Sequence, residues 1–263
     1  MSKRRAAITI ALLALACTTA RSAPLALPPA PQHAQFTQNV GASLPLQQRF
    51  TDDDGRPVRL ADVLDRHSAL LLFGYYRCPM LCGVVGTGVL EALTRAQLPD
   101  DAVRVVEIGI DPHETSADAA QKKADYARRF GSLARRMHLL TGAPAAIDAL
   151  TRAAGFQYSY DAAHAQYVHP AGFLVVTPHG RISRYFFGAR FDAQELRSAL
   201  AQAADDHVGS ALAQLLLLCA HYDPSSGRYS VTVMTLVRVV CIGVCALLSV
   251  WIWRRRRARG NSR

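Results

Sequence analysis

The stretch LLLFGYYRCPMLCGVVGTGVL, residues 70–90, decides the fold. It begins as an apolar run typical of a buried strand and continues as a segment of small and apolar residues that we expect to be helical. Cys78 and Cys82, with three residues between them, lie where the strand gives way to the helix. Two thiols at such a junction are placed for a structural disulfide, for redox exchange or for a soft metal site.

Strand and helix patterns alternate on both sides of this stretch. Strands are expected at 68–76, 103–110, 137–141, 172–177 and 182–187, and helices at 61–64, 82–97, 115–130, 143–154 and 192–204. The alternation predicts parallel strands with helices on both faces, and the two adjacent strands near the end predict an antiparallel pair. A hairpin with an Asp-Gly turn is expected before them, from residues 44–50 and 58–60.

The dithiol follows the first central strand and opens the first long helix, which is the thioredoxin arrangement. We therefore predict an α/β fold of the thioredoxin-like class, with a central mixed sheet flanked by helices. An N-terminal β-hairpin extension and one C-terminal transmembrane helix complete the expected fold.

The two ends of the chain carry targeting signals. Residues 1–22 predict a signal peptide, with basic residues at 3–5, an apolar segment and a small-x-small site at its end; Cys17 leaves a lipoprotein signal as the alternative. Residues 231–253 form an apolar run of 23 residues with Arg238 as its one charge. At about 1.5 Å per residue, this run is long enough to cross a hydrocarbon core of roughly 30 Å.

The basic residues after that run indicate the orientation. Four arginines follow at 254–257, and the positive-inside rule places them in the cytoplasm. Both ends therefore predict a single-pass protein of the bacterial cytoplasmic membrane with its functional domain in the periplasm. The expected domains are the signal peptide 1–22, a linker 23–40, a thioredoxin-like domain 41–207 that contains the dithiol, a helical connector 208–230, the membrane helix 231–253 and a basic tail 254–263.

The net charge of +10 is confined to the two ends. Residues 1–22 carry +4 and residues 254–263 carry +6, so the remainder is 10 − 4 − 6 = 0. A domain that grips phosphates needs a basic surface in its folded part. The sequence therefore excludes nucleic acid as a partner.

The spacing of the two cysteines determines what they can hold. Thiolates at a helix N-terminus are stabilised by the free N–H groups and partial positive charge there. With both residues helical, Cys78 and Cys82 stand at i and i+4 and their sulfurs share one face. Soft thiolates favour Cu(I), whereas a closed zinc site needs four ligands and the motif supplies two.

His169 is the candidate third ligand. It stands just before the strand expected at 172–177, and in a thioredoxin-like fold the loop before that strand packs against the dithiol. From the residues alone, a ligand and a loop histidine without a site role are equally good interpretations.

The motif Gly74-Tyr75-Tyr76-Arg77-Cys78-Pro79-Met80-Leu81-Cys82, with Asp111-Pro112 downstream and His169 later, resembles the SCO/SenC family of copper-binding assembly proteins. The resemblance covers about residues 44–187. It implies a thioredoxin-like, membrane-tethered protein that binds copper, as Cu(I) or Cu(II), through Cys78, Cys82 and His169. It also implies a role in assembling the dinuclear copper centre of cytochrome c oxidase.

Two features depart from the family pattern. Many members carry Asp directly before the ligand histidine, where this chain has Val168; such a carboxylate orients the ring. Many members also have an N-terminal anchor, whereas this chain is expected to have a C-terminal one. The resemblance is thus to a variant branch of the family.

Several other residues have two interpretations each. His113 and His164 are alternative ligands or exposed loop residues, and Met80 is a thioether donor or apolar packing. Asp111 either caps the next helix or assists partner docking. The cysteines outside the motif, Cys219, Cys241 and Cys245, are most simply read as packing residues.

The leading hypothesis is a membrane-tethered copper chaperone. Its expected partners are the apo copper-site subunit of cytochrome c oxidase, or a similar copper client, and a thiol reductant. The alternative is an enzyme, a thiol–disulfide oxidoreductase that reduces client cysteines with Cys78 and Cys82 as its redox dithiol. Whether the protein is an enzyme is left open by the sequence.

Overall fold

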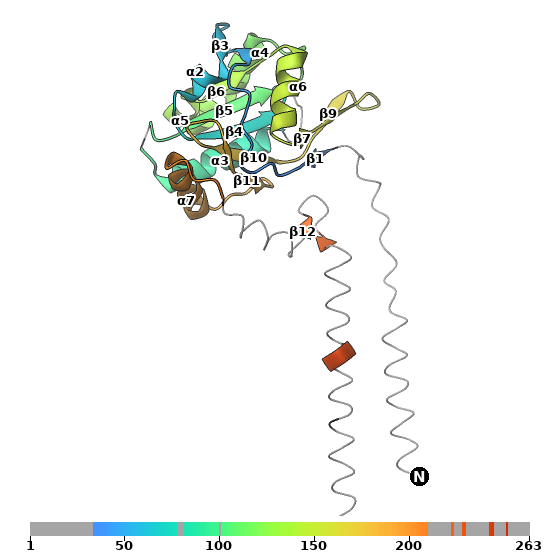
Figure 1. Ribbon diagram of the computed structural model, residues 1–263. Coiled ribbons are helices and arrows are strands. Elements are labelled where there is room, and N and C mark those ends of the chain that lie inside the picture. Colours follow the sequence, from blue (N-terminus) through green and yellow to red (C-terminus); the bar gives the residue numbers. More distant parts are fainter. Residues whose placement is uncertain are drawn as a thin grey trace, which may run out of the picture. The chain divides into compact units, whose positions relative to one another are not determined.

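The computed structural model describes residues 34–77, 82–99 and 101–209, with the short segments 222–223, 228–229, 242–244 and 251. The chain divides into two units, Met1–Gln32 and His33–Arg263, and all described residues belong to the second. Figure 1 shows their elements, whose labels are kept here.

The centre of the domain is a five-stranded mixed sheet in the order β11-β10-β4-β5-β6. Its strands are β4 (Ala69–Gly74), β5 (Arg104–Gly109), β6 (His138–Leu140), β10 (Gly172–Val176) and β11 (Ile182–Phe187). β4, β5 and β6 are parallel, while β10 runs antiparallel to both β4 and β11. The predicted parallel centre and antiparallel end are therefore confirmed.

Helices cover both faces of this sheet (Figure 1). They are α2 (Leu60–Leu64), α3 (Cys82–Ala96), α4 (Ser116–Phe130), α5 (Ser132–Arg135), α6 (Pro144–Ala153) and α7 (Ala193–Ala204). Alternation along β4 explains the two layers, because successive side chains of a strand point to opposite faces. Leu71 and Phe73 pack in one hydrophobic cluster with α2 and α6, and Leu70 and Leu72 pack in the other with α3, α4, α5 and α7.

Short strand pairs surround the central sheet. They are β1 (Gln35–Phe36) with β7 (Phe156–Gln157), β2 (Arg49–Thr51) with β3 (Pro57–Arg59), β8 (Ser159–Asp161) with β9 (Gln166–Val168), and β12 (Tyr222–Asp223) with β13 (Arg228–Tyr229). β2 and β3 are the predicted hairpin. Its turn contains Gly55 at a φ of +80°, a conformation that glycine adopts without strain.

Other expectations need correction. The expected linker contains β1, so folded structure begins before residue 41. The expected helical connector contains the strands β12 and β13. Helix α4 is capped by Thr115 and not by Asp111, because the Thr115 side chain accepts a hydrogen bond from the backbone N–H of Asp118 and the reciprocal bond is also present.

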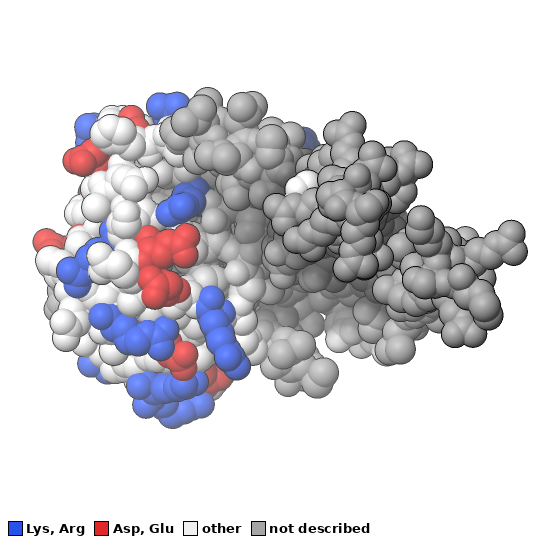
Figure 2. Space-filling model, turned by 90° about the horizontal axis from the view of Figure 1, so that it is seen from below, with Lys and Arg blue, Asp and Glu red and all other residues white. Residues whose placement is uncertain are grey.

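No helix among the described residues has both the length and the apolar character that a membrane span requires. The expected signal peptide and nearly all of the expected membrane helix lie outside the described residues. On the face of the domain seen in Figure 2, basic and acidic side chains are interspersed. This mixture agrees with the zero net charge that the sequence assigns to the part of the chain between its two ends.

Candidate metal centre

The sheet brings three segments to one edge. β4 ends at Gly74 just before the dithiol loop, and parallel pairing of Gly74 with Gly109 places the end of β5 beside it. β10 is antiparallel to β4, so its beginning lies at that same edge, with Phe173 opposite Leu72. The residues that follow β4 and β5 therefore meet those that precede β10.

Cys82 is the first residue of α3. Its side chain and the whole of Cys78 lie outside the described residues. The first N–H groups of a helix have no partner within the helix and favour negative charge. The position of Cys82 is thus the one predicted from the sequence, at the start of the helix that follows β4.

His169 lies in the short segment between β9 and β10 and is half-buried. Its ring centroid is 6.1 Å from that of Tyr75, which precedes Cys78 by three residues, and 5.9 Å from that of Phe156. The histidine therefore packs against the segment that leads from β4 to the dithiol. Its ligand role stays a prediction, because Cys78 and the side chain of Cys82 lie outside the described residues.

The surroundings of His169 favour a neutral ring with its proton on Nδ1. Nδ1 lies 3.1 Å from the carbonyl oxygen of Pro170. Because a carbonyl only accepts, Nδ1 is assigned the proton in that contact, and the lone pair is on Nε2. Burial lowers the pKa of His169, which favours the neutral ring that metals bind.

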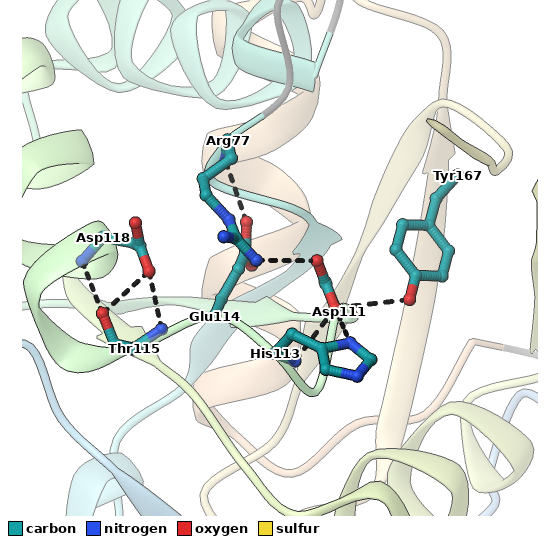
Figure 3. Close-up of polar contacts among 7 residues, drawn as sticks. All are labelled: Arg77, Asp111, His113, Glu114, Thr115, Asp118 and Tyr167. Carbon is teal, nitrogen blue, oxygen red and sulfur yellow. Dashed lines mark hydrogen bonds and ion pairs between the residues drawn. The ribbon is translucent and has the colours of Figure 1, made fainter. Parts of the chain in front are cut away.

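Asp111 links the two sides of the site (Figure 3). Its Oδ2 is 3.2 Å from Nη2 of Arg77, the residue before Cys78, and its Oδ1 accepts a hydrogen bond of 3.3 Å from the hydroxyl of Tyr167. Tyr167 belongs to β9, the strand that leads to His169. Burial would raise the pKa of Asp111, but hydrogen bonds from His113 and Arg77 hold it below its usual value.

The buried carboxyl groups of Glu107 and Glu114 lie near the end of β4 and the residues that follow it. Glu114 accepts a 2.8 Å hydrogen bond from the backbone N–H of Arg77, as Figure 3 shows. Glu107 points from β5 toward the α3 side, where its Oε1 would lie 3.3 Å from a Cβ placed on Gly74. Burial raises the pKa of each group to about 7. Oε2 of each has no hydrogen-bond partner among the described residues.

Of the two alternative histidine ligands, His113 lies beside the candidate site through its contact with Asp111, whereas His164 contacts Asp161. His113 is exposed, and its Nδ1 lies 2.9 Å from Oδ1 of Asp111. His164 is exposed beyond β8, 2.7 Å from Oδ2 of Asp161. Within the described part of the chain, no three His, Cys, Asp or Glu residues form a group able to hold a metal ion. Cys78 and the side chain of Cys82 lie outside that part.

Sequence reasoning missed most of the supporting residues. Glu107 had a visible signal, because it is the one charged residue inside the apolar strand Val105–Ile110. Glu114, Arg77 and Tyr167 had none, because each acts through a partner more than thirty residues away in the sequence.

Comparisons with known proteins agree with this architecture. A profile of the SCO1/SenC family matches residues 38–205. The chain belongs to the SCO1/SenC family. Among solved structures, it is similar to a SCO1/SenC family lipoprotein from Bacillus anthracis, with 16% identity, 62% of this chain and 96% of that chain covered, and a TM-score of 0.53.

A candidate electron transfer protein from Aquifex aeolicus is similar over 63% of this chain and 95% of its own, with 18% identity and a TM-score of 0.56. Bradyrhizobium japonicum ScoI, solved with copper bound, is similar over 62% of this chain and 99% of its own, with 22% identity and a TM-score of 0.48. At these identities the Bacillus anthracis and Aquifex aeolicus structures show a shared fold, which is thioredoxin-like. No curated protein matches the chain.

Proposed function

We propose that this SCO1/SenC protein is a copper chaperone that holds copper through Cys78, Cys82 and His169 and supplies it for assembly of the copper centre of cytochrome c oxidase. The observation that carries the proposal is the position of His169. Its ring packs against Tyr75, three residues before the dithiol, with Nε2 as the nitrogen that bears the lone pair.

The donor set supports copper over harder ions. Two thiolates and a neutral imidazole are soft or intermediate donors, which suit Cu(I). The thiols must lose their protons when the metal binds, so loading requires the reduced dithiol and releases protons. The carboxylate of Asp111 contacts Arg77, the residue before Cys78, and Tyr167, two residues before His169. It would therefore help to keep the two ligand-bearing segments close to each other.

The tether and the compartment are part of the same proposal. The signal peptide at 1–22 and the apolar run at 231–253, followed by arginines, support a periplasmic domain anchored at its C-terminal side. An anchored donor would meet a membrane-bound client, here the apo copper-site subunit of the oxidase, at a raised effective concentration.

Copper titration of the reduced full-length protein tests this function. We expect about one Cu(I) per chain, and loss of high-affinity binding in Cys78→Ser, Cys82→Ser. His169→Ala should weaken binding by more than the roughly 10–100-fold that the loss of an outer-shell partner costs. His164→Ala is the matched control, because that ring is exposed and held by Asp161. Full affinity in the double cysteine variant would refute the proposal.

The second candidate is thiol–disulfide exchange, favoured by the position of Cys82 at a helix N-terminus. One thiolate would attack a client disulfide, and the other would resolve the mixed disulfide, leaving the client reduced and this dithiol oxidised. A thiol reductant would then restore it. His169→Ala separates the candidates, because exchange does not use the ring and should be retained in that variant.

A further inference from the structure

A cavity of about 270 Å³ lies between the end of α3, the beginning of β5 and the segment that leads from α5 into β6. β4, β5 and β6 are parallel and begin at one edge of the sheet, where Ala69 pairs with Arg104. This edge, called the far edge below, is opposite to the one at which Gly74 pairs with Gly109 beside the candidate metal centre. The cavity is therefore a separate site, formed without any residue of that centre.

The lining of the cavity combines an apolar floor with a basic rim. In the floor, Leu98, Val103 and Leu133 are half-buried, so part of their apolar surface is open to a ligand. No carboxylate among the described residues lines the cavity. Asp101 is exposed and does not line it, and Asp100 lies outside the described residues. The basic residues of the rim are Arg104, Lys123, Arg135, Arg136 and His138.

Two cations of the rim are held in place by carboxylates that do not line the cavity. Nη2 of Arg104 lies 3.2 Å from Oδ2 of Asp65, and Nζ of Lys123 lies 2.7 Å from Oδ2 of Asp53. A guanidinium has five N–H donors, so this contact leaves Arg104 with donors for a ligand. Arg135 is exposed and forms no ion pair with a carboxylate in the described part of the chain.

The positive charges of the rim lie close enough together to act on one another. Burial lowers the pKa of His138, and the charges of Lys123 and Arg104 lower it further, whereas the charge of Asp53 partly opposes them. An anion in the cavity would relieve this repulsion, because it would be attracted by each of these groups.

The size and lining of the cavity fit a phosphate group that carries an apolar chain. At roughly 30 Å³ for a group the size of a water molecule, the cavity holds about nine such groups. Arginine binds phosphate oxygens through pairs of parallel hydrogen bonds. The apolar floor offers an adjoining surface on which a hydrocarbon chain is removed from water.

The chain leaves the domain at the same edge. The backbone N–H of Gly209 donates a hydrogen bond of 3.3 Å to the carbonyl of Ser183, which stands near the beginning of β11. β11 is antiparallel to β10, and β10 is antiparallel to β4, so β11 begins at the far edge. The apolar run at 231–253, the proposed anchor, begins 231 − 209 = 22 residues further on. A bilayer anchored there is a nearby source of phosphate esters with apolar chains.

We propose that this cavity binds a phosphate ester with an apolar chain, its phosphate held by the arginines of the rim and its chain packed on the apolar floor. A membrane phospholipid and a free alkyl phosphate offer the same chemistry. Occupation by a phospholipid would hold the far edge on the bilayer and leave the candidate metal centre facing away from it. The site is independent of the proposed copper function, and only its lipid source rests on the proposed anchor.

The first test is calorimetric titration of the full-length protein in phosphatidylcholine nanodiscs with hexyl phosphate, inorganic phosphate and 1-hexanol. Each buried CH₂ strengthens binding by about fourfold, from about 0.8 kcal/mol per CH₂. We therefore expect hexyl phosphate to bind at least roughly tenfold more tightly than inorganic phosphate. 1-Hexanol, which has the same chain without the charge, should bind more weakly than hexyl phosphate.

Variants of the rim and the floor test the two parts of the site separately. Removing both exposed arginines, in Arg135→Met, Arg136→Met, should weaken hexyl phosphate binding by at least about tenfold. Val103→Thr, which changes the floor without changing its shape, should weaken hexyl phosphate binding and leave inorganic phosphate unchanged. Arg184→Met is the matched control, because Arg184 is an exposed arginine of β11 that does not line the cavity.

The source of the ligand is tested by hydrogen exchange of residues 133–138 in nanodiscs with and without phosphatidylglycerol. Protection by phosphatidylglycerol in wild type, lost in the double arginine variant, would assign the site to membrane phospholipid. Hexyl phosphate binding without such protection would assign it to a free ester.

Three results would overturn the proposal. They are no binding of hexyl phosphate, equal affinities for hexyl phosphate and inorganic phosphate, and an affinity for hexyl phosphate that the double arginine variant retains. Each of them would leave the copper proposal unaffected, because the cavity contains none of the residues proposed to bind copper.

Discussion

Replacing Glu107 by glutamine should stabilise the protein at alkaline pH and have little effect in acid. Glu107 is 2% exposed, and burial raises its pKa from 4.5 to about 7. Between those values the unfolded chain releases a proton that the folded protein retains, so stability falls as the pH rises. At about 1.36 kcal/mol per pKa unit, the penalty is about 3 kcal/mol at pH 8 and below about 1 kcal/mol at pH 5.

The assay is urea unfolding of wild type and Glu107→Gln at both pH values. Glutamine cannot ionise, so the difference between the two proteins isolates the contribution of Glu107. We expect Glu107→Gln to be more stable by about 3 kcal/mol at pH 8, with the difference shrinking by roughly 2.5 kcal/mol at pH 5. Glu195→Gln, at an exposed site on α7, is the control. A difference that does not change with pH would refute the reasoning.

Three further substitutions test other contacts of the domain. Asp111→Ala should weaken Cu(I) binding by about tenfold in chelator competition, because the carboxylate that contacts both Arg77 and Tyr167 is removed. An unchanged affinity would contradict the role of Asp111 in linking these two residues. Gly86→Ala should destabilise the protein by about 1–3 kcal/mol in urea unfolding, because the new Cβ would lie 2.2 Å from Oη and 2.7 Å from Cζ of Tyr126. An unchanged free energy of unfolding would contradict this overlap. Tyr185→Phe should lower the free energy of unfolding by about 1–3 kcal/mol, measured by thermal unfolding. The buried hydroxyl donates to the carbonyl of Ala154 and accepts from the backbone N–H of Asn39. An unchanged stability would show that neither hydrogen bond contributes.

The central elements were predictable because their signals are local. The apolar run of β4, the small residues of α3 and the cap at Asp192 before α7 each show in a few consecutive residues. Gly155, just after α6, has a φ of +67°, the left-handed conformation that ends helices. Such patterns need no knowledge of what packs against them.

The peripheral strands were not predictable in the same way. β1 and β7 are two residues each and pair Gln35 with Gln157 across more than a hundred residues. β8 and β9 form a hairpin around Ala165, which adopts a φ of +50° without being glycine or asparagine. Strands this short are defined by their partners, so a scan for periodicity cannot detect them.

The same difference between local and long-range signals applies to the residues of the candidate site. Cys78, Cys82 and His169 were identified because their residue types carry the chemistry. Residues that hold them in place were missed, because Glu114 and Tyr167 act through long-range hydrogen bonds. Asp111 was noticed, but its helix-capping interpretation was wrong, since Thr115 performs that role. Asp111 lies two residues beyond β5, beside the end of β4, and this position allows it to contact both Arg77 and Tyr167.

The closeness of His169 to the end of β4 follows from the packing of the core. The antiparallel register of β4 and β10 places Phe173 opposite Leu72, and both side chains are almost completely buried. β10 is buried on both faces, and its side chains differ in size, with Phe173 packed against Phe186 and Phe191 in one cluster and Leu174 in the other. A slip of one residue would exchange side chains of different size between two close-packed clusters, which specifies the register. His169 stands four residues before Phe173, and β4 ends at Gly74, two residues after Leu72, at the same edge of the sheet. Two segments far apart in the sequence are therefore brought together by the same contacts that stabilise the fold, and the polar bridge through Asp111 needs only to adjust a spacing that the sheet already sets.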